Sequence, residues 1–164
     1  QLAVPYQPAW EEIIAEFGSE YLNPDKTLNK SKLAVEIFQN DKKRNALEGI
    51  LHPRVIAEEQ KIYSDRQRID PEAVVVIESA LLIESENYKN VDKVIVVQST
   101  QELQIQHVVN RDGNSSISVK NRLKSQMPLE EKLNYADYVL DNTNGRDLLK
   151  SQVHRLYTEF KNLA

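Results

Sequence analysis

The chain has 164 residues, of which 40% are hydrophobic and 28% charged, a composition typical of one globular domain that can bury a core. It has no cysteine, which excludes disulfides, thiolate metal ligands and cysteine nucleophiles, and no apolar run long enough to suggest a membrane span. The net charge of −4 gives no reason to expect nucleic-acid binding. No secretory signal is visible, so we expect a cytoplasmic protein without membrane partners.

The first part of the chain is expected to be helical. PAWEEIIAEFG (8–18) predicts a helix with Pro8 at its start and Gly18 at its end. Asn29 can cap a helix over NKSKLAVEIFQN (29–40). Asp41 is expected to cap a shorter helix, and Pro53 to restart the chain as a long polar one.

The second part predicts an α/β fold. The apolar runs AVVVI (73–77) and KVIVV (93–97) are typical of strands buried on both faces of a parallel sheet, and DYVLDN (137–142) predicts a third strand. Amphipathic helices are expected over 100–110, over a short stretch after Pro128, and from 145 to 160. Strands alternating with helices favour a parallel sheet with flanking helices.

Polar residues follow each predicted strand: Glu78-Ser79, Gln98-Ser99-Thr100 and Asp141-Asn142-Thr143. In open α/β sheets, ligands bind at the carboxyl ends of the strands. Strand ends are also polar because they meet solvent, so both interpretations stay open.

A short positive segment interrupts the acidic chain. Residues 111–126 carry Arg111, Lys120, Arg122 and Lys124 against Asp112, a net charge of +3 (four minus one). Gly113, Asn114 and two serines make its start pliable. Guanidinium groups bind phosphate oxygens bidentately, so the segment fits a flap that covers phosphates. A solvated surface loop is the alternative.

Several segments, taken in order, resemble dephospho-coenzyme A kinases. RDG…RLKSQMPLEEK…ADYVLDN (111–142) resembles that family's arginine-bearing lid, its Gln-Met-Pro turn and the strand that follows. GILHPRV (49–55) and VVVIESALLIE (74–84) resemble its Leu-His-Pro and third-strand motifs, and 17–38 resembles its helical substrate-side region. The likeness covers nearly the whole chain. Ser79-Ala80 stand where the family usually has Val-Pro, and Ile83 where it has Phe.

The resemblance implies a P-loop-kinase fold and an organisation of the chain. Residues 1–164 would form a single, incomplete kinase domain, with a helical acceptor-binding subdomain over about 8–70. The α/β core would comprise 73–110 and 137–164, and residues 111–128, which we call the lid segment, would close over the phosphates. The implied reaction transfers a phosphoryl group from ATP, with Mg²⁺, to the ribose 3′-hydroxyl of dephospho-coenzyme A, the last step of coenzyme A biosynthesis.

The resemblance also implies roles for individual residues. Arg111 and Arg122 would contact phosphates from the lid segment, and Glu78 could hold Mg²⁺ through water, with no direct metal ligand expected. Gln126 and Met127 would brace the return of the lid segment. Phe17, Phe38 and Leu51 are expected in the core rather than on a pantetheine-binding surface. The remaining expected sites are the adenine side (Asn142, Gly145 and Arg146) and the acceptor side (His52, Glu78, Ser79 and Leu81).

One family element is absent from these residues. The four glycines, at 18, 49, 113 and 145, form no Walker A sequence G-x-x-x-x-G-K-[ST]. About forty residues normally precede the first recognisable segment in a P-loop kinase, and they include a central strand. We therefore expect the central strand to be missing here and this chain alone to be inactive.

Two interpretations of that absence, and two rival functions, stay open. We favour a chain that is part of a longer kinase; the other is a fragment that closes its sheet by rearrangement or with a second copy. The rival functions are a different P-loop kinase, acting on a nucleoside or nucleotide, and a non-catalytic binding module. Nothing in the sequence specifies an oligomeric state.

Overall fold

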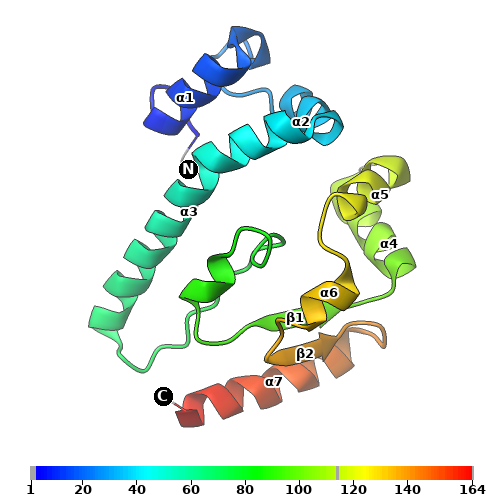
Figure 1. Ribbon diagram of the computed structural model, residues 1–164. Helices are drawn as coiled ribbons and strands as arrows, with labels where there is room; N and C mark the ends of the chain where they lie inside the picture. The colour runs from blue at the N-terminus through cyan, green and yellow to red at the C-terminus, as the bar shows by residue number, and fades with distance from the viewer. Residues whose placement is uncertain (1–2, 114, 164) are drawn as a thin grey trace. The chain divides into compact units, whose positions relative to one another are not determined.

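The computed structural model describes residues 3–113 and 115–163, which fall into two compact units with a boundary between Asp65 and Arg66. The first unit contains α1 (Pro8–Phe17), the short 3₁₀ helix η1 (Ser19–Tyr21), α2 (Lys30–Gln39) and most of α3 (Asp41–Ile69) (Figure 1). The described residues contain no helix that is long and apolar enough to cross a membrane.

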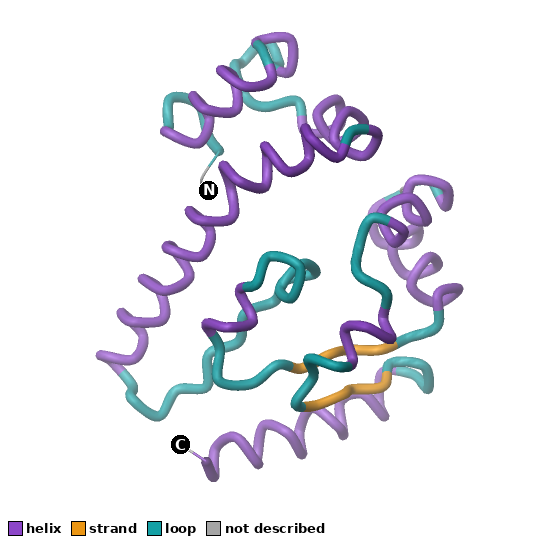
Figure 2. Tube along the Cα trace, viewed as in Figure 1, coloured by secondary structure: helices purple, strands orange, loops and turns teal. Residues whose placement is uncertain are grey.

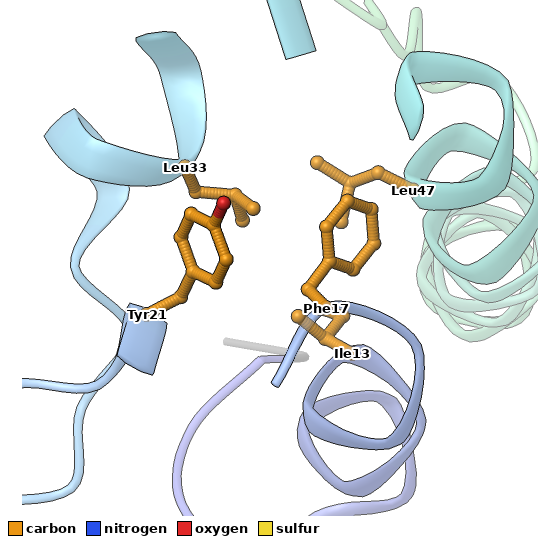
Figure 3. Close-up of a cluster of buried hydrophobic side chains, with 5 residues drawn as sticks. All are labelled: Ile13, Phe17, Tyr21, Leu33 and Leu47. Atoms are coloured by element: carbon orange, nitrogen blue, oxygen red, sulfur yellow. The ribbon is translucent and has the colours of Figure 1, made fainter. Parts of the chain in front are cut away.

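The core of the first unit lies between its helices. Ile13, Phe17, Tyr21, Leu33 and Leu47 are all buried, and Figure 3 shows them pointing toward one another from α1, η1, α2 and α3. The Phe17 and Tyr21 rings meet edge to face, with their centroids 6.3 Å apart. This arrangement confirms Phe17 as a core residue. Phe38 is 37% exposed, so the expectation that it lies in the core is wrong.

The local signals at the ends of α1 and α2 are confirmed. Pro8 lies in the first turn of α1, and Gly18 ends the helix with φ +98°, a conformation that side chains with a Cβ rarely adopt. The Asn29 side chain accepts a hydrogen bond of 2.9 Å from the Lys32 N–H and so caps α2.

The predicted helix break at Pro53 is wrong, because α3 runs from Asp41 to Ile69 with Pro53 inside it. A proline removes one helical hydrogen bond and crowds the preceding turn. Here the Arg54 guanidinium donates to the Ile50 carbonyl at 2.6 Å and to Glu12 on α1 at 2.6 Å, which supplies a donor in the turn before the proline. The cap also differs: the Asn40 side chain, rather than Asp41, accepts the Lys43 N–H at 3.2 Å.

The second unit is built on a small parallel sheet. The strands β1 (Ile95–Gln98) and β2 (Tyr138–Asp141) pair in parallel, with Ile95 opposite Tyr138 and Gln98 opposite Asp141 (Figure 2). The other elements are η2 (Asn87–Asn90), α4 (Gln101–Asp112), α5 (Ser116–Lys124), α6 (Leu129–Leu133) and α7 (Arg146–Leu163). Helices α4 and α5 contact each other, and α7 packs beside β2. The buried hydrophobic residues are Ile83, Val94, Val96, Val119 and Leu156.

The predicted strand over 73–77 is wrong. The segment has no regular secondary structure and belongs to no ladder among the described residues, and the Val76 side chain is 74% exposed. A strand buried on both faces requires hydrogen-bonded neighbours, and each buried ladder group left unpaired costs about 1–3 kcal/mol. Without a neighbouring strand the run stays irregular, with Val75 and Val76 exposed.

Candidate functional site

The carboxyl ends of β1 and β2 lie side by side, as the parallel register requires. The Asn142 N–H donates to the Gln98 carbonyl at 2.9 Å, and the Ser99 hydroxyl donates to the Asn142 carbonyl at 3.4 Å. Two of the three polar strand ends predicted from the sequence are therefore joined directly. The third, Glu78-Ser79, follows an irregular segment rather than a strand.

A tight turn follows β2 and leads into α7. The Asp141 carboxylate accepts the Thr143 hydroxyl at 2.6 Å and the Thr143 N–H at 2.7 Å. These bonds favour the charged form and lower the pKa of Asp141, with the Thr143 hydroxyl as the largest cause. Gly145 turns the chain with φ +91°, and Arg146 begins α7 as an exposed residue. The three expected adenine-side residues thus lie in one turn.

Arg111 lies at the end of α4 and is paired within its own turn. Its Nε and Nη2 atoms contact the two carboxylate oxygens of Asp112 at 2.7 and 3.0 Å, while its side chain stays 73% exposed. The bond to Asp112 raises the pKa of Arg111, and the negative charge of Glu78 adds to the effect.

Arg122 lies on α5 and is half-buried. The pKa of Asp112 is lowered mainly by its bond to Arg111, with a further contribution from the charge of Arg122. Asp112, for which the sequence predicted no role, thus bonds to Arg111 and is influenced by the charge of Arg122 from α5, the helix in contact with α4. Arg111 and Arg122 therefore supply two positive charges against the single negative charge of Asp112.

Most of the lid segment is helical rather than a loose loop. Gly113 ends α4 with φ +67°, and the Ser115 side chain caps α5 by accepting the Ser118 N–H at 3.2 Å. Asn114, which was expected to make this turn pliable, lies outside the described residues.

The acceptor-side residues fall in both units. Glu78 and Ser79 are exposed, Leu81 is half-buried, and the Ser79 hydroxyl accepts the Leu81 N–H at 3.3 Å. These three belong to the second unit, whereas His52 is half-buried on α3 in the first.

The sequence analysis did not select Glu84 and Lys132 as functional residues. Lys132 Nζ contacts Glu84 Oε1 at 2.9 Å and donates to the Ala80 carbonyl at 2.8 Å. Glu84 Oε1 also accepts the Met127 N–H at 2.9 Å, so the predicted bracing of Met127 has a physical basis. Both residues occur in the motifs that carry the resemblance, but only the fold pairs them.

No group of three or more His, Asp or Glu side chains in the described part of the chain could hold a metal ion. His107 on α4 and His154 on α7 are exposed.

Comparisons with known proteins agree with the motifs. The sequence profile of the dephospho-CoA kinase family matches residues 1–147. A dephospho-CoA kinase of Aquifex aeolicus is 35% identical over 93% of this chain and 76% of its own length. One of Halalkalibacterium halodurans is 34% identical over 96% of this chain and 78% of its own length.

Solved structures agree with the fold. A Thermus thermophilus protein of known crystal structure is 28% identical, with a TM-score of 0.71 over 92% of this chain and 75% of that one. A dephospho-CoA kinase from Campylobacter jejuni is 30% identical, with a TM-score of 0.59 over 94% of this chain and 77% of that one. The chain therefore belongs to the dephospho-CoA kinase family, which is a family of phosphotransferases with an α/β, P-loop-kinase-like fold.

Proposed function

We propose that the protein takes part in the ATP-dependent phosphorylation of the ribose 3′-hydroxyl of dephospho-CoA. The observation that carries this proposal is the placement of two lid-segment arginines on contacting helices, Arg111 at the end of α4, bonded to Asp112, and Arg122 on α5. Family membership supports the choice of substrate class. Two guanidinium groups on adjoining helices suit an anionic ligand with several phosphate oxygens, because each can bind two of them.

The roles of the parts follow from that placement. The lid segment, residues 111–128, would bring Arg111 and Arg122 onto the transferred phosphoryl group and neutralise its charge. Asn142, Gly145 and Arg146 would border the adenine of ATP, since they share the turn after β2. Ser79, Leu81 and His52 would contact dephospho-CoA, with residues 8–70 as its helical binding region.

Mg²⁺ is proposed to arrive with the phosphates of ATP. Magnesium is commonly held by one or two carboxylates together with substrate phosphates. Glu78, an exposed carboxylate whose charge raises the pKa of Arg111, is the group proposed to contact it through water.

We also propose that these 164 residues alone do not catalyse the phosphorylation of dephospho-CoA. A Walker A loop cradles the β- and γ-phosphates with backbone N–H groups and a lysine, and the chain contains no such loop. The test is to incubate the purified 164-residue chain with Mg-ATP and dephospho-CoA and to follow the product by mass spectrometry. We expect no product above the rate without protein, whereas a rate near that of an intact kinase would contradict the proposal.

The substrate assignment is tested separately on the protein expressed from its complete reading frame. We expect phosphorylation of dephospho-CoA, with the new phosphate at the 3′ position by phosphorus NMR. Preferential turnover of a nucleoside or nucleotide would favour a different P-loop kinase. Binding of dephospho-CoA without binding of ATP in that protein would favour a non-catalytic module.

A further inference from the structure

A single ion pair joins the end of the lid segment to the stretch that follows Glu78 and Ser79. Glu84 Oε1 accepts two donors, Lys132 Nζ and the Met127 N–H, both at 2.9 Å. Lys132 Nζ also donates to the Ala80 carbonyl at 2.8 Å. Met127 follows α5, which carries Arg122, and Ala80 directly follows Ser79. We call Glu84, Lys132, Met127 and Ala80 the lid junction.

The burial of this pair argues against a purely stabilising role. The Glu84 and Lys132 side chains are 21% and 17% exposed, against 36% and 47% for Asp137 and Lys93 in a comparable pair. Glu84 Oε2 is buried and has no hydrogen-bond partner among the described residues. Burying charges costs desolvation energy that pairing often fails to offset, so such a pair adds little to the stability of the fold. What it does provide is a fixed geometry between the groups that it joins.

We propose that Glu84 and Lys132 are positioning residues that set where Arg122 lies relative to Glu78 and Ser79. The inference rests on the proposed function in one respect: it takes Arg122 and the 78–81 stretch as the two sides of the phosphoryl-transfer site. The lysine holds the carbonyl next to Ser79, and the carboxylate holds the backbone at the return of the lid segment. The Lys132–Glu84 ion pair is the link between these two contacts, so loss of either charge weakens the connection between the two sides.

The expected kinetic signature is a fall in kcat. If the junction moves, substrates still bind through their own contacts, but the guanidinium no longer meets the transferred group in the right geometry. A displacement of about 1 Å can lower a rate about 100-fold. We therefore expect Glu84→Gln and Lys132→Gln to lower kcat at least 10-fold while the KM for dephospho-CoA changes less than 3-fold.

The experiment compares four variants of the protein expressed from its complete reading frame. Glu84→Gln and Lys132→Gln remove one charge each, and Lys132→Arg keeps the charge and the donors. Asp137→Asn is the matched control, because Asp137 also joins a lysine, Lys93 at 3.1 Å, to a backbone N–H, that of Val94 at 2.8 Å. Its pair lies at the amino ends of the strands, away from the candidate site.

Hydrogen exchange at the backbone amides gives a readout that is independent of activity. We expect the Met127 amide and the amides of α5 to exchange at least 10-fold faster in the two neutral variants, and those of α7 to stay within 2-fold of the parent. Lys132→Arg should match the parent in amide exchange and in kcat. If the neutral variants do not fold, this variant supplies the test of the positioning role. Asp137→Asn should leave the α5 amides unchanged.

The outcomes that overturn the inference are distinct from failure of the proposed function. Parent-like exchange at Met127 and α5 in both neutral variants would overturn it, as would an equal acceleration of these amides in Asp137→Asn. Faster exchange with unchanged kcat would also overturn the positioning role and leave the kinase assignment standing. If the parent protein has no kinase activity, the proposed function fails, and the exchange data alone decide whether the pair holds the lid segment.

Discussion

Arg111 and Arg122 are the residues whose chemistry the proposed reaction uses most directly. Arg111 is exposed and occupied by Asp112, a pairing that a phosphate group can replace because both present two oxygens to the guanidinium. Arg122 contributes to the same field from the neighbouring helix. Asp112 therefore acts as the counter-ion of the site as long as no phosphate is bound.

Replacing either arginine should lower catalysis in the complete protein. We expect Arg111→Gln and Arg122→Gln each to reduce kcat about 100-fold, because each removes a cation from the charge that develops on the transferred group. Steady-state assays with dephospho-CoA measure the effect. Lys120→Gln, on the same helix as Arg122, is the matched control and should stay within about 3-fold of the parent. Undiminished turnover with both arginines replaced would remove the basis of the proposal.

The charge of Asp137 should make stability depend on pH. The Val94 N–H and, after it, Lys93 lower the pKa of Asp137 in the folded protein. A carboxyl group with a lowered pKa stabilises the fold above its unfolded pKa of about 3.9, and this stabilisation is lost as the pH falls through the folded pKa. Thermal melting of Asp137→Asn should therefore fall below the parent at pH 7 and converge with it in acid. A constant difference in Tm across that range would contradict the assignment.

At the scale of elements, β2 shows how the small sheet protects its outer edge. The Gln152 side chain on α7 accepts the Asp141 N–H at 2.9 Å and donates to the Asp141 carbonyl at 2.9 Å. A side-chain amide thus supplies the two bonds that a further strand would otherwise make. Open edges pair readily with other chains, so this contact also blocks edge-to-edge association.

Removing that amide should destabilise the second unit. We expect Gln152→Leu to lower the free energy of unfolding by about 1–3 kcal/mol, since it leaves both backbone groups of Asp141 unpaired. Urea unfolding measures the loss. Gln106→Leu, at an exposed position on α4, serves as the control and should change stability by less than about 0.5 kcal/mol. Equal stability of the two variants would show that water replaces the amide without cost.

At the scale of the whole molecule, the first unit is held by a cluster of buried hydrophobic residues. Phe17 lies in this cluster and is 7% exposed. We expect Phe17→Ala to lower the free energy of unfolding by about 3–5 kcal/mol, because it removes an aromatic ring from a packed site and leaves a cavity. Hydrogen exchange should show the loss of protection in α1, η1 and α2. Protection in these helices equal to that of the parent would mean that Phe17 does not hold the first unit together.

The sequence predicted features that depend on neighbouring residues better than features that depend on residues far apart in the chain. Caps and turns such as Asn29 and Gly18 were correct because they involve neighbouring residues. The prediction of a break at Pro53 was wrong, and the contact that ties α3 to α1 beside the proline, Arg54 to Glu12, joins residues far apart in the sequence. At the site, the motifs predicted the arginines of the lid segment but missed Asp112 and Lys132, whose partners depend on how the helices end and pack.

The sequence by itself determined the family, most of the helices and the two paired strands, because ordered motifs and hydrophobic periodicity are written in short stretches of chain. The tertiary structure alone decided that residues 73–77 form no strand and that Glu84 meets Lys132 and Met127. A strand exists only where a neighbour accepts its hydrogen bonds. A buried ion pair likewise forms only where packing brings two distant charges together.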